Sequence, residues 1–409
     1  MGPWRAPGAK GESMLIRNAR LADGTIVDIR IEGEHIAAMG HDLPAAVPMV
    51  DAEGALALPA FVEGHTHLDK TFWGAAWYRN EVGPRLIDRI ENERATRRGN
   101  GLDPLAQAER LALDFLALGT TRIRSFADVD TEIGIRHVEA LVTLRERLRG
   151  LMDIQVVAFP QSGLLIRPTT LDLLEAAMQA GADVVGGLDP AGIDRDPKGH
   201  LDAVFDLCSR FRAPLDVHLH EPGELGAFSM ELIIERTRAL SMQGRVVISH
   251  AFCLGDVAPA RAMALYDGLA EAGIALATTA PPSRAVPSVK AARAAGVTIF
   301  GGNDGIRDAW TPYGAPDMLQ RAMLIGLKNE FRRDDEIALA MECVTTAGAI
   351  GCGFEGAGIA TGDRADLVLL PVETVAEAVV GQPRDRLVIS HGRIVAQGAA
   401  LMPELSPAE

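Results

Sequence analysis

Residues 60–69 read AFVEGHTHLD, an apolar run that ends in two histidines one residue apart. Seven similar apolar runs follow, at residues 121–129, 154–161, 183–190, 214–221, 245–252, 274–282 and 297–304. Helical patterns that end in turn signals such as Gly119, Gly181 and Gly296 separate most of these runs. Near-continuous apolar strands that alternate with helices are typical of a parallel sheet covered by helices. The count of eight favours a closed (β/α)8 TIM barrel over an open doubly wound sheet.

Both ends of the chain have a different pattern from the middle. Residues 14–57 and 363–400 carry short alternating runs punctuated by Gly and Asp, which is typical of small antiparallel sheets. We therefore expect the two ends to form one small β-sandwich domain together, and residues 58–362 to form the barrel. Residues 1–13 hold charges and turn formers and no apolar segment, so they are expected to be disordered, and residues 401–409 form a tail.

Composition limits the kind of partner. The chain has 40 Lys and Arg against 55 Asp and Glu, a formal net charge of −15, which disfavours nucleic-acid or anionic-membrane partners. It has no run of 18 or more apolar residues, so no membrane span is expected. Its four cysteines lack C-x-x-C spacing and are too few for a disulfide framework. We expect a soluble cytoplasmic protein with a small-molecule partner.

Polar residues collect at the ends of the predicted strands, where the chemistry of TIM barrels lies. His65 and His67 are expected to point the same way, because side chains alternate along a strand. Asp304 ends the eighth run. Five of the ten histidines end just three strands, although a lone strand histidine is more often structural: His65, His67, His218, His220 and His250. Imidazoles and a carboxylate at one barrel mouth indicate a divalent transition-metal site without thiolates.

Four motifs resemble one known family. The segments are FVEGHTHLDKT, VHLHE, ISHAFC and FGGNDGIRDAW, at residues 61–71, 217–221, 248–253 and 300–310. They resemble the amidohydrolase superfamily, and within it the branch that contains cytosine deaminase and N-isopropylammelide amidohydrolase. The resemblance covers essentially residues 14–400 and implies the same barrel and split terminal domain.

The resemblance also implies roles for single residues. It implies that one divalent metal ion, zinc or iron, is bound by four residues: His65, His67, His218 and Asp304. It implies further that Glu221 shuttles protons and that His250 orients or polarises the hydroxide. A bound divalent ion lowers the pKa of its water to roughly 7, and the Asp304 carboxylate can accept the proton that this water loses. The fourth strand ends in GGLDP, without the carboxylated lysine of binuclear members, so one metal is expected.

The substrate contacts follow from the same resemblance. Gln161 matches the family glutamine that pairs with an amide-like ring edge, and its carboxamide offers both a donor and an acceptor. Trp310 either stacks on a planar heterocycle or packs at the barrel rim. Gly305 stands where cytosine deaminase has a second aspartate, which removes a carboxylate, enlarges the pocket and weakens the case for cytosine. Phe72, Trp73, Trp77 and Tyr78 either roof the pocket or fill a homo-oligomer interface. The charged run at residues 85–99 is expected to be a solvated helix face.

The predicted function is metal-dependent hydrolytic deamination of an amino-substituted nitrogen heterocycle of pyrimidine, pterin or triazine type. Ammonia or an amine would leave. Two alternatives stay open: a cyclic amide hydrolase of the same superfamily, and a catalytically inactive metal-binding barrel. The presence of Glu221 and His250, which bind no metal in this scheme, favours an enzyme over an inactive barrel.

Overall fold

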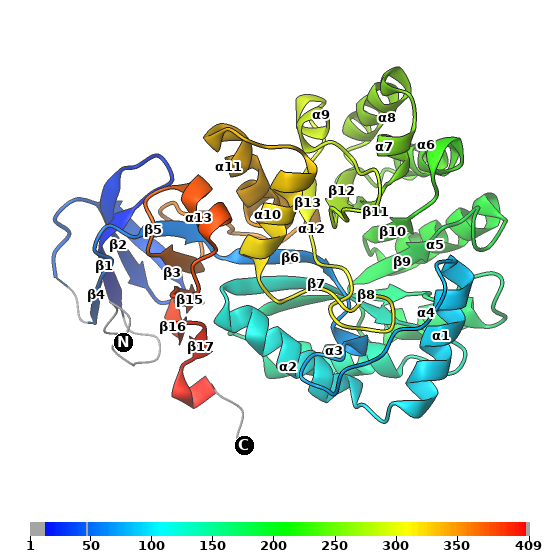
Figure 1. The fold of residues 1–409 in the computed structure, drawn as a ribbon, viewed down its shortest axis with the longest axis horizontal. Coiled ribbons are helices and arrows are strands. Elements are labelled where there is room, and N and C mark those ends of the chain that lie inside the picture. The colour runs from blue at the N-terminus through cyan, green and yellow to red at the C-terminus, as the bar shows by residue number, and fades with distance from the viewer. Residues whose placement is uncertain (1–12, 46–47, 406–409) are drawn as a thin grey trace.

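The computed structural model describes residues 13–45 and 48–405, so the disorder predicted for residues 1–13 falls almost entirely outside the described residues. Figure 1 shows two parts side by side, a small sheet domain that carries both ends of the chain and a larger barrel. Both parts of the predicted fold class are confirmed.

Eight parallel strands form the barrel in chain order, one from each predicted run. They are β6 (Phe61–Thr66), β7 (Thr120–Asp128), β8 (Asp153–Phe159), β9 (Val184–Leu188), β10 (Leu215–Leu219), β11 (Val246–His250), β12 (Ala275–Thr278) and β13 (Ile299–Gly301). Most of their residues are buried, because the interior packs on one face and the helices on the other.

The barrel closes between its first and last strands. A parallel bridge joins Thr66 to Asp304, and the Asp304 backbone N–H donates to the His65 carbonyl at 2.8 Å. Gly302 makes this approach possible, since a Cβ at that position would lie 2.5 Å from the His65 Cβ. The closure therefore places the ends of the first and eighth strands side by side.

Helices connect and cover the strands, and their ends follow local sequence signals. Asp103 caps α2 by accepting from the Ala106 N–H, with Pro104 in the first turn. Gly119 and Gly181 end their helical segments with positive φ, as predicted. The helices are α1 (Leu86–Gly99), α2 (Pro104–Ala117), α3 (Arg136–Arg147), α4 (Thr170–Gln179), α5 (Pro197–Phe211), α6 (Gly223–Ala239), α7 (Cys253–Asp256), α8 (Pro259–Glu271), α9 (Val289–Ala294), α10 (Met318–Lys328), α11 (Asp334–Cys343), α12 (Thr346–Cys352) and α13 (Val375–Gly381), with short 3-10 helices η1 (Leu68–Lys70) and η2 (Pro403–Leu405).

The two ends of the chain share one nine-stranded sheet. Its strands are β1 (Met14–Arg20), β2 (Ile26–Glu32), β3 (His35–Gly40), β4 (Met49–Asp51), β5 (Leu56–Pro59), β14 (Leu367–Leu370), β15 (Leu387–Ser390), β16 (Arg393–Gln397) and β17 (Ala400–Leu401). The halves join where β5 pairs with β14, with Leu58 opposite Val368. The N–H of Ala365, shortly before β14, donates to the carbonyl of Glu34, directly before β3, at 2.8 Å, although β3 and β14 are not neighbours in the sheet. The sheet therefore curls back on itself around its own core.

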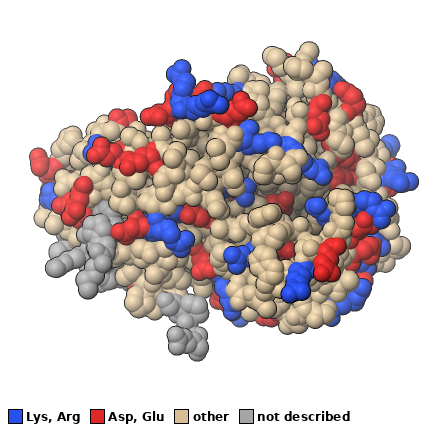
Figure 2. Space-filling model, viewed as in Figure 1, with Lys and Arg blue, Asp and Glu red and all other residues tan. Residues whose placement is uncertain are grey.

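The surface carries both signs of charge. Figure 2 shows basic and acidic side chains interspersed over the viewed face, with no large area of one sign. Among the described residues, none of the helices combines the length and apolar character that crossing a membrane requires.

Candidate active site

Three histidines and one aspartate converge at the C-terminal mouth of the barrel. His65 lies near the end of strand β6 and His67 directly after it, His218 lies in β10, and Asp304 lies three residues after the end of β13. One nitrogen or oxygen from each of the four lies within 4.8 Å of the others. The Asp304 Oδ1 is 3.3 Å from the His67 Nε2 and 3.7 Å from the His65 Nε2. The histidines are buried, whereas the Asp304 side chain is 40% exposed toward the mouth.

Several ring nitrogens in this cluster are buried but have no hydrogen-bond partner. The His65 Nε2 and both ring nitrogens of His218 and His250 lack hydrogen-bond partners among the described residues. His200, by contrast, uses both nitrogens, one with Asp194 and one with the Leu188 N–H. Because an unsatisfied buried polar atom costs free energy, the unpartnered nitrogens fit a site built for a divalent ion.

The charge states suit the same purpose. Burial and the neighbouring imidazoles hold the pKa of His218 well below its usual value, so the ring is neutral, as a metal ligand must be. Although burial opposes it, the adjacent imidazoles of His65 and His67 hold the pKa of Asp304 well below its usual range. Asp304 and His250 both adopt positive φ, which non-glycine residues keep only where the surrounding structure enforces it.

A buried relay fixes the orientation of His65. The Ser249 hydroxyl donates to the Asp216 Oδ1 at 2.6 Å, so its oxygen accepts from the His65 Nδ1–H at 2.9 Å. The Arg124 guanidinium pairs with the other oxygen of Asp216 at 3.0 Å. The His65 Nε2 lone pair is therefore directed at the metal cluster. Sequence reasoning missed this relay, although an aspartate inside the apolar run PLDVHLHE was an available signal.

Glu221 and His250 take different positions. The His250 ring lies 4.8 Å from the His65 ring, inside the cluster. The Glu221 Oε1 accepts from the backbone N–H groups of Ala191 and Gly192, both at 2.7 Å, and the Ser229 hydroxyl donates to its Oε2. Burial raises the pKa of Glu221. Its carboxyl is therefore held by the loop after β9, and no hydrogen bond joins it to the metal cluster within the described chain.

His220 lies beside the cluster and received no role from the sequence. Its ring stacks on that of His250 with centroids 4.4 Å apart. Its Nδ1 lies 2.8 Å from the Asp189 Oδ2, and although burial opposes it, this carboxylate raises the pKa of His220. The available signal was the Asp189-Pro190 turn that ends the fourth predicted strand.

The second group of site residues centres on Lys70, which the sequence reasoning did not single out. Its Nζ donates to the Gln161 Oε1 at 2.5 Å and to the Asp128 Oδ1 at 3.0 Å, and lies 3.1 Å from the Glu93 Oε1. The Trp310 indole N–H donates to the Glu93 Oε2 at 2.8 Å, and its ring centroid is 5.9 Å from the Lys70 Nζ. Gln161 and Trp310 are thus joined through one buried set of charges.

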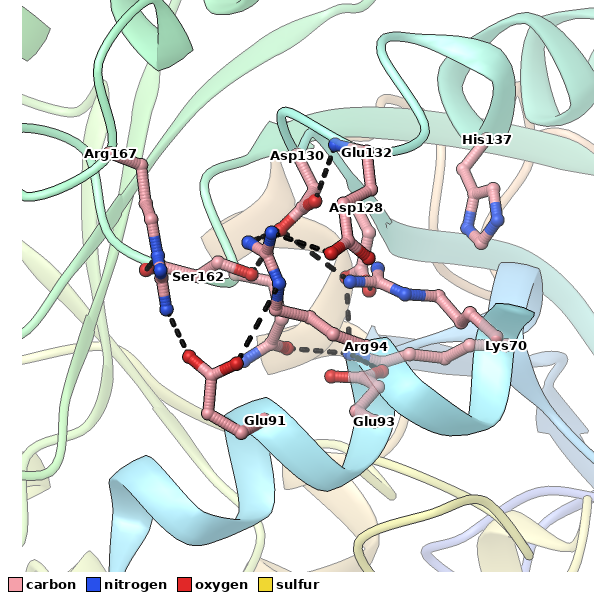
Figure 3. A network of polar contacts seen from close by, with 12 residues as sticks. Lys70, Glu91, Glu93, Arg94, Asp128, Asp130, Glu132, His137, Ser162 and Arg167 are labelled. Carbon is pink, nitrogen blue, oxygen red and sulfur yellow. Dashed lines mark hydrogen bonds and ion pairs between the residues drawn. The ribbon is translucent and has the colours of Figure 1, made fainter. Parts of the chain in front are cut away.

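Helix α1 supplies part of these charges. Figure 3 shows its side chains reaching into a network with the loops after β7 and β8. Arg94 pairs with Asp130 at 2.9 Å, and Arg97 pairs with Asp128 at 2.7 Å. Glu93 is only 2% exposed. The expectation that residues 85–99 form a solvated face is therefore wrong for the side of α1 that faces the barrel, because its charges are paired with partners distant in sequence.

The structure corrects the expectation for Gly305. A Cβ on Gly305 would lie 1.9 Å from the Asp308 Oδ2, so the Asp308 carboxyl occupies the space that we expected to enlarge the pocket. The Asp308 Oδ1 accepts from the backbone N–H groups of Trp310 and Thr311. Burial raises the pKa of Asp308 to about 7. A carboxyl group is thus present beside Gly305, supplied three residues later in the chain.

Comparisons with known proteins point in one direction. A sequence model of the amidohydrolase family matches residues 49–396. N-isopropylammelide isopropyl amidohydrolase of Pseudomonas sp. strain ADP is 31% identical over 414 residues, covering 96% of this chain and 100% of that protein. The crystal structure of N-isopropylammelide isopropylaminohydrolase from Burkholderia multivorans is 54% identical, with a TM-score of 0.93 and coverage of 96% and 100%. That of 5-methylcytosine deaminase from Klebsiella pneumoniae is 26% identical, with a TM-score of 0.83 and coverage of 94% and 97%.

Proposed function

This chain belongs to the amidohydrolase family, and we propose that it removes an amino or alkylamino group from a nitrogen heterocycle by hydrolysis. The observation that carries the proposal is the cluster of buried, unpartnered imidazole nitrogens around Asp304 at the barrel mouth. Such a donor set suits one divalent ion per subunit, zinc or iron. His65, His67, His218 and Asp304 would hold it.

A bound divalent ion supplies Lewis acidity and lowers the pKa of a coordinated water to about 7. With an ion bound, the partly exposed Asp304 carboxylate would be placed to accept a proton from the attacking water, and His250 would orient that water. Water provides the new oxo oxygen of the ring, and the C–N bond to the amino group breaks. Phe126 and Phe159 pack against the histidines and exclude other water from beneath the site.

Glu221 is the proposed proton carrier to the ring nitrogen and the departing amine. Its raised pKa, caused by burial, favours the protonated form that such a step needs. The N–H groups of Ala191 and Gly192 hold its Oε1 in place. Gln161 is proposed to bind the ring edge and Trp310 to cover the ring.

The similarity to ammelide and methylcytosine enzymes favours a substrate ring that carries both amino and oxo groups. We also propose a cytoplasmic location, supported by four free, buried cysteines, and a homo-oligomer, supported by exposed aromatics such as Trp77 at 68%.

The test is a panel of rings with the fully metal-loaded protein: N-isopropylammelide, cytosine, 5-methylcytosine and a pterin. Free ammonia or isopropylamine is measured together with loss of the ring's ultraviolet absorption. Amine release with an intact ring supports deamination. Ring opening without amine supports the cyclic amide hydrolase, and no turnover of any ring at full metal content supports the inactive barrel.

A further inference from the structure

Lys70 and Gln161 meet at the barrel mouth close to the metal cluster. Lys70 ends η1, three residues after His67, and Gln161 lies two residues after Phe159, whose ring stacks on His218 at 4.1 Å. The Lys70 Nζ and the Gln161 Oε1 are 2.5 Å apart, and both residues are buried, at 8% and 5% exposure. The contact is therefore part of the wall of the proposed substrate site.

This contact allows only one orientation of the glutamine amide. A lysine ammonium has three donors and no acceptor, so only the carbonyl oxygen of Gln161 can face it. The ammonium donates hydrogen bonds to the oxygens of Gln161 and Asp128, and it forms an ion pair with Glu93 at 3.1 Å. A rotated amide would put its NH2 group against a buried cation. The Gln161 Nε2 consequently faces away from Lys70.

The amide nitrogen of Gln161 remains free to bind a ligand. Within the described chain, no acceptor contacts the Gln161 Nε2, and this atom is not among the fully buried unsatisfied atoms. The backbone N–H of the same residue is already used by the Phe159 carbonyl. Gln161 therefore presents N–H donors, and no acceptor, to a ring in the site.

Lys70 itself is not available to a substrate. Its positive charge and that of Arg97 are balanced by Asp128 and Glu93, and Arg97 pairs with Asp128 at 2.7 Å. The Lys70 ammonium is therefore already paired with carboxylates of this chain and offers no free positive charge to an anion. The function left to Lys70 is to hold Gln161.

We infer that Lys70 is a positioning residue that fixes Gln161 as a hydrogen-bond donor, so that the site selects rings with an oxo oxygen at that edge over rings with an amino group there. This inference rests on the proposed function, because it defines the substrate class of the same site. It also sharpens the sequence-based expectation that the glutamine offers both a donor and an acceptor.

The experiment compares binding of cyanuric acid and melamine to the metal-loaded protein by calorimetry. Cyanuric acid carries an oxo group on all three ring carbons, and melamine carries an amino group on all three. The edge that faces Gln161 is therefore the same in each of the three rotated orientations of either ring. We expect cyanuric acid to bind at least about tenfold more tightly. Equal binding, or tighter binding of melamine, would overturn the inference.

Two variants test the role of Lys70 separately. Gln161→Glu keeps a partner for Lys70 but offers only acceptors, so the ratio of the two affinities should fall at least about tenfold or reverse. Lys70→Met frees the amide to rotate, so the ratio should approach one. Lys198→Met, at an exposed lysine, is the matched control and should preserve it.

A variant at either site that folds and keeps the wild-type ratio contradicts the inference. Since Lys70→Met leaves two buried carboxylates short of a partner, Gln161→Glu decides the question if that protein does not fold. The proposed function is tested separately. If no ring of the panel is turned over but cyanuric acid still binds more tightly than melamine, the proposed function is wrong and the inference about Lys70 stands.

Discussion

The two sides of the barrel mouth differ in the partners of their buried polar groups. On the side of β6, β10, β11 and β13, buried imidazole nitrogens have no protein partner. On the side of α1, β7 and β8, nearly every buried charge has one, as with Lys70 beside Asp128, Glu93 and Gln161 (Figure 3). The first side presents imidazoles whose nitrogens lack hydrogen-bond partners. The second side presents charges joined in ion pairs, although single atoms there, such as the Glu93 Oε1, also lack a hydrogen bond.

This difference indicates which side of the mouth binds a ligand and which side holds the site in shape. Buried polar groups left open indicate where a group from outside the chain completes the site, since leaving them unsatisfied is costly. A network of ion pairs holds the wall of a site in one shape and binds little itself. Changes on the open side should therefore act on metal and turnover, and changes on the paired side on stability and selectivity.

The largest effect is expected from His218→Ala. It removes a donor from the open side, so metal content should fall and amine release should drop by about three orders of magnitude or more. Elemental analysis and amine release measure the two. His35→Ala, at an exposed histidine of the small domain, should change neither. Full activity of His218→Ala without bound metal would contradict the assignment.

Glu221→Gln comes next. The amide cannot carry a proton between water and ring, so turnover should fall by about 10²- to 10⁴-fold while metal content stays at the wild-type level. Steady-state rates and elemental analysis of the same sample measure both. Glu235→Gln on the exposed face of α6 is the matched control. Near wild-type rates would refute the role given to Glu221.

Ser249→Ala tests whether the open side depends on support beneath it. Without the hydroxyl, the His65 Nδ1–H loses its acceptor, and metal affinity should fall about 10- to 100-fold. Competition with a chelator measures it, and Ser249→Thr should restore most of the loss. Ser390→Ala, which removes another buried hydroxyl far from the site, should leave metal affinity unchanged. Unchanged affinity in Ser249→Ala would mean that the relay has no role in metal binding.

The smallest effect on turnover is expected on the paired side. Glu93→Gln leaves Lys70 with one carboxylate fewer, so stability to urea should fall by roughly 1–3 kcal/mol while metal content is kept. Glu91→Gln alters an exposed pair on the same helix and should cost less than about 1 kcal/mol. If Glu93→Gln released the metal instead, the two sides would not be separate.

Sequence predicted the open side better than the paired side. The eight strands repeat a recognisable pattern, and barrels place their chemistry at strand ends. The meeting of His65, His218 and Asp304 at the barrel mouth could therefore be predicted without structural information. The paired side is built from contacts between residues far apart in sequence: Lys70 and Gln161 are 91 positions apart, and Arg94 and Asp130 are 36 apart. The sequence alone does not show whether a charged side chain is solvated or paired with a residue distant in the chain.

The misreading at Gly305 has the same origin on a shorter scale. The sequence shows that residue 305 has no side chain, but only the path of the following loop shows that Asp308 turns back over it. Glycine there indicated space for a neighbour and was read as space for the substrate.

Three of the four proposed metal ligands lie at the seam where the barrel closes, and this position has a consequence for stability. The first and last strands meet through the Thr66–Asp304 bridge and a few hydrogen bonds. His65 and His67 stand on one side of that seam and Asp304 on the other. An ion bound by these residues would link the first and last strands, so its removal should lower the stability of the barrel as well as abolish turnover.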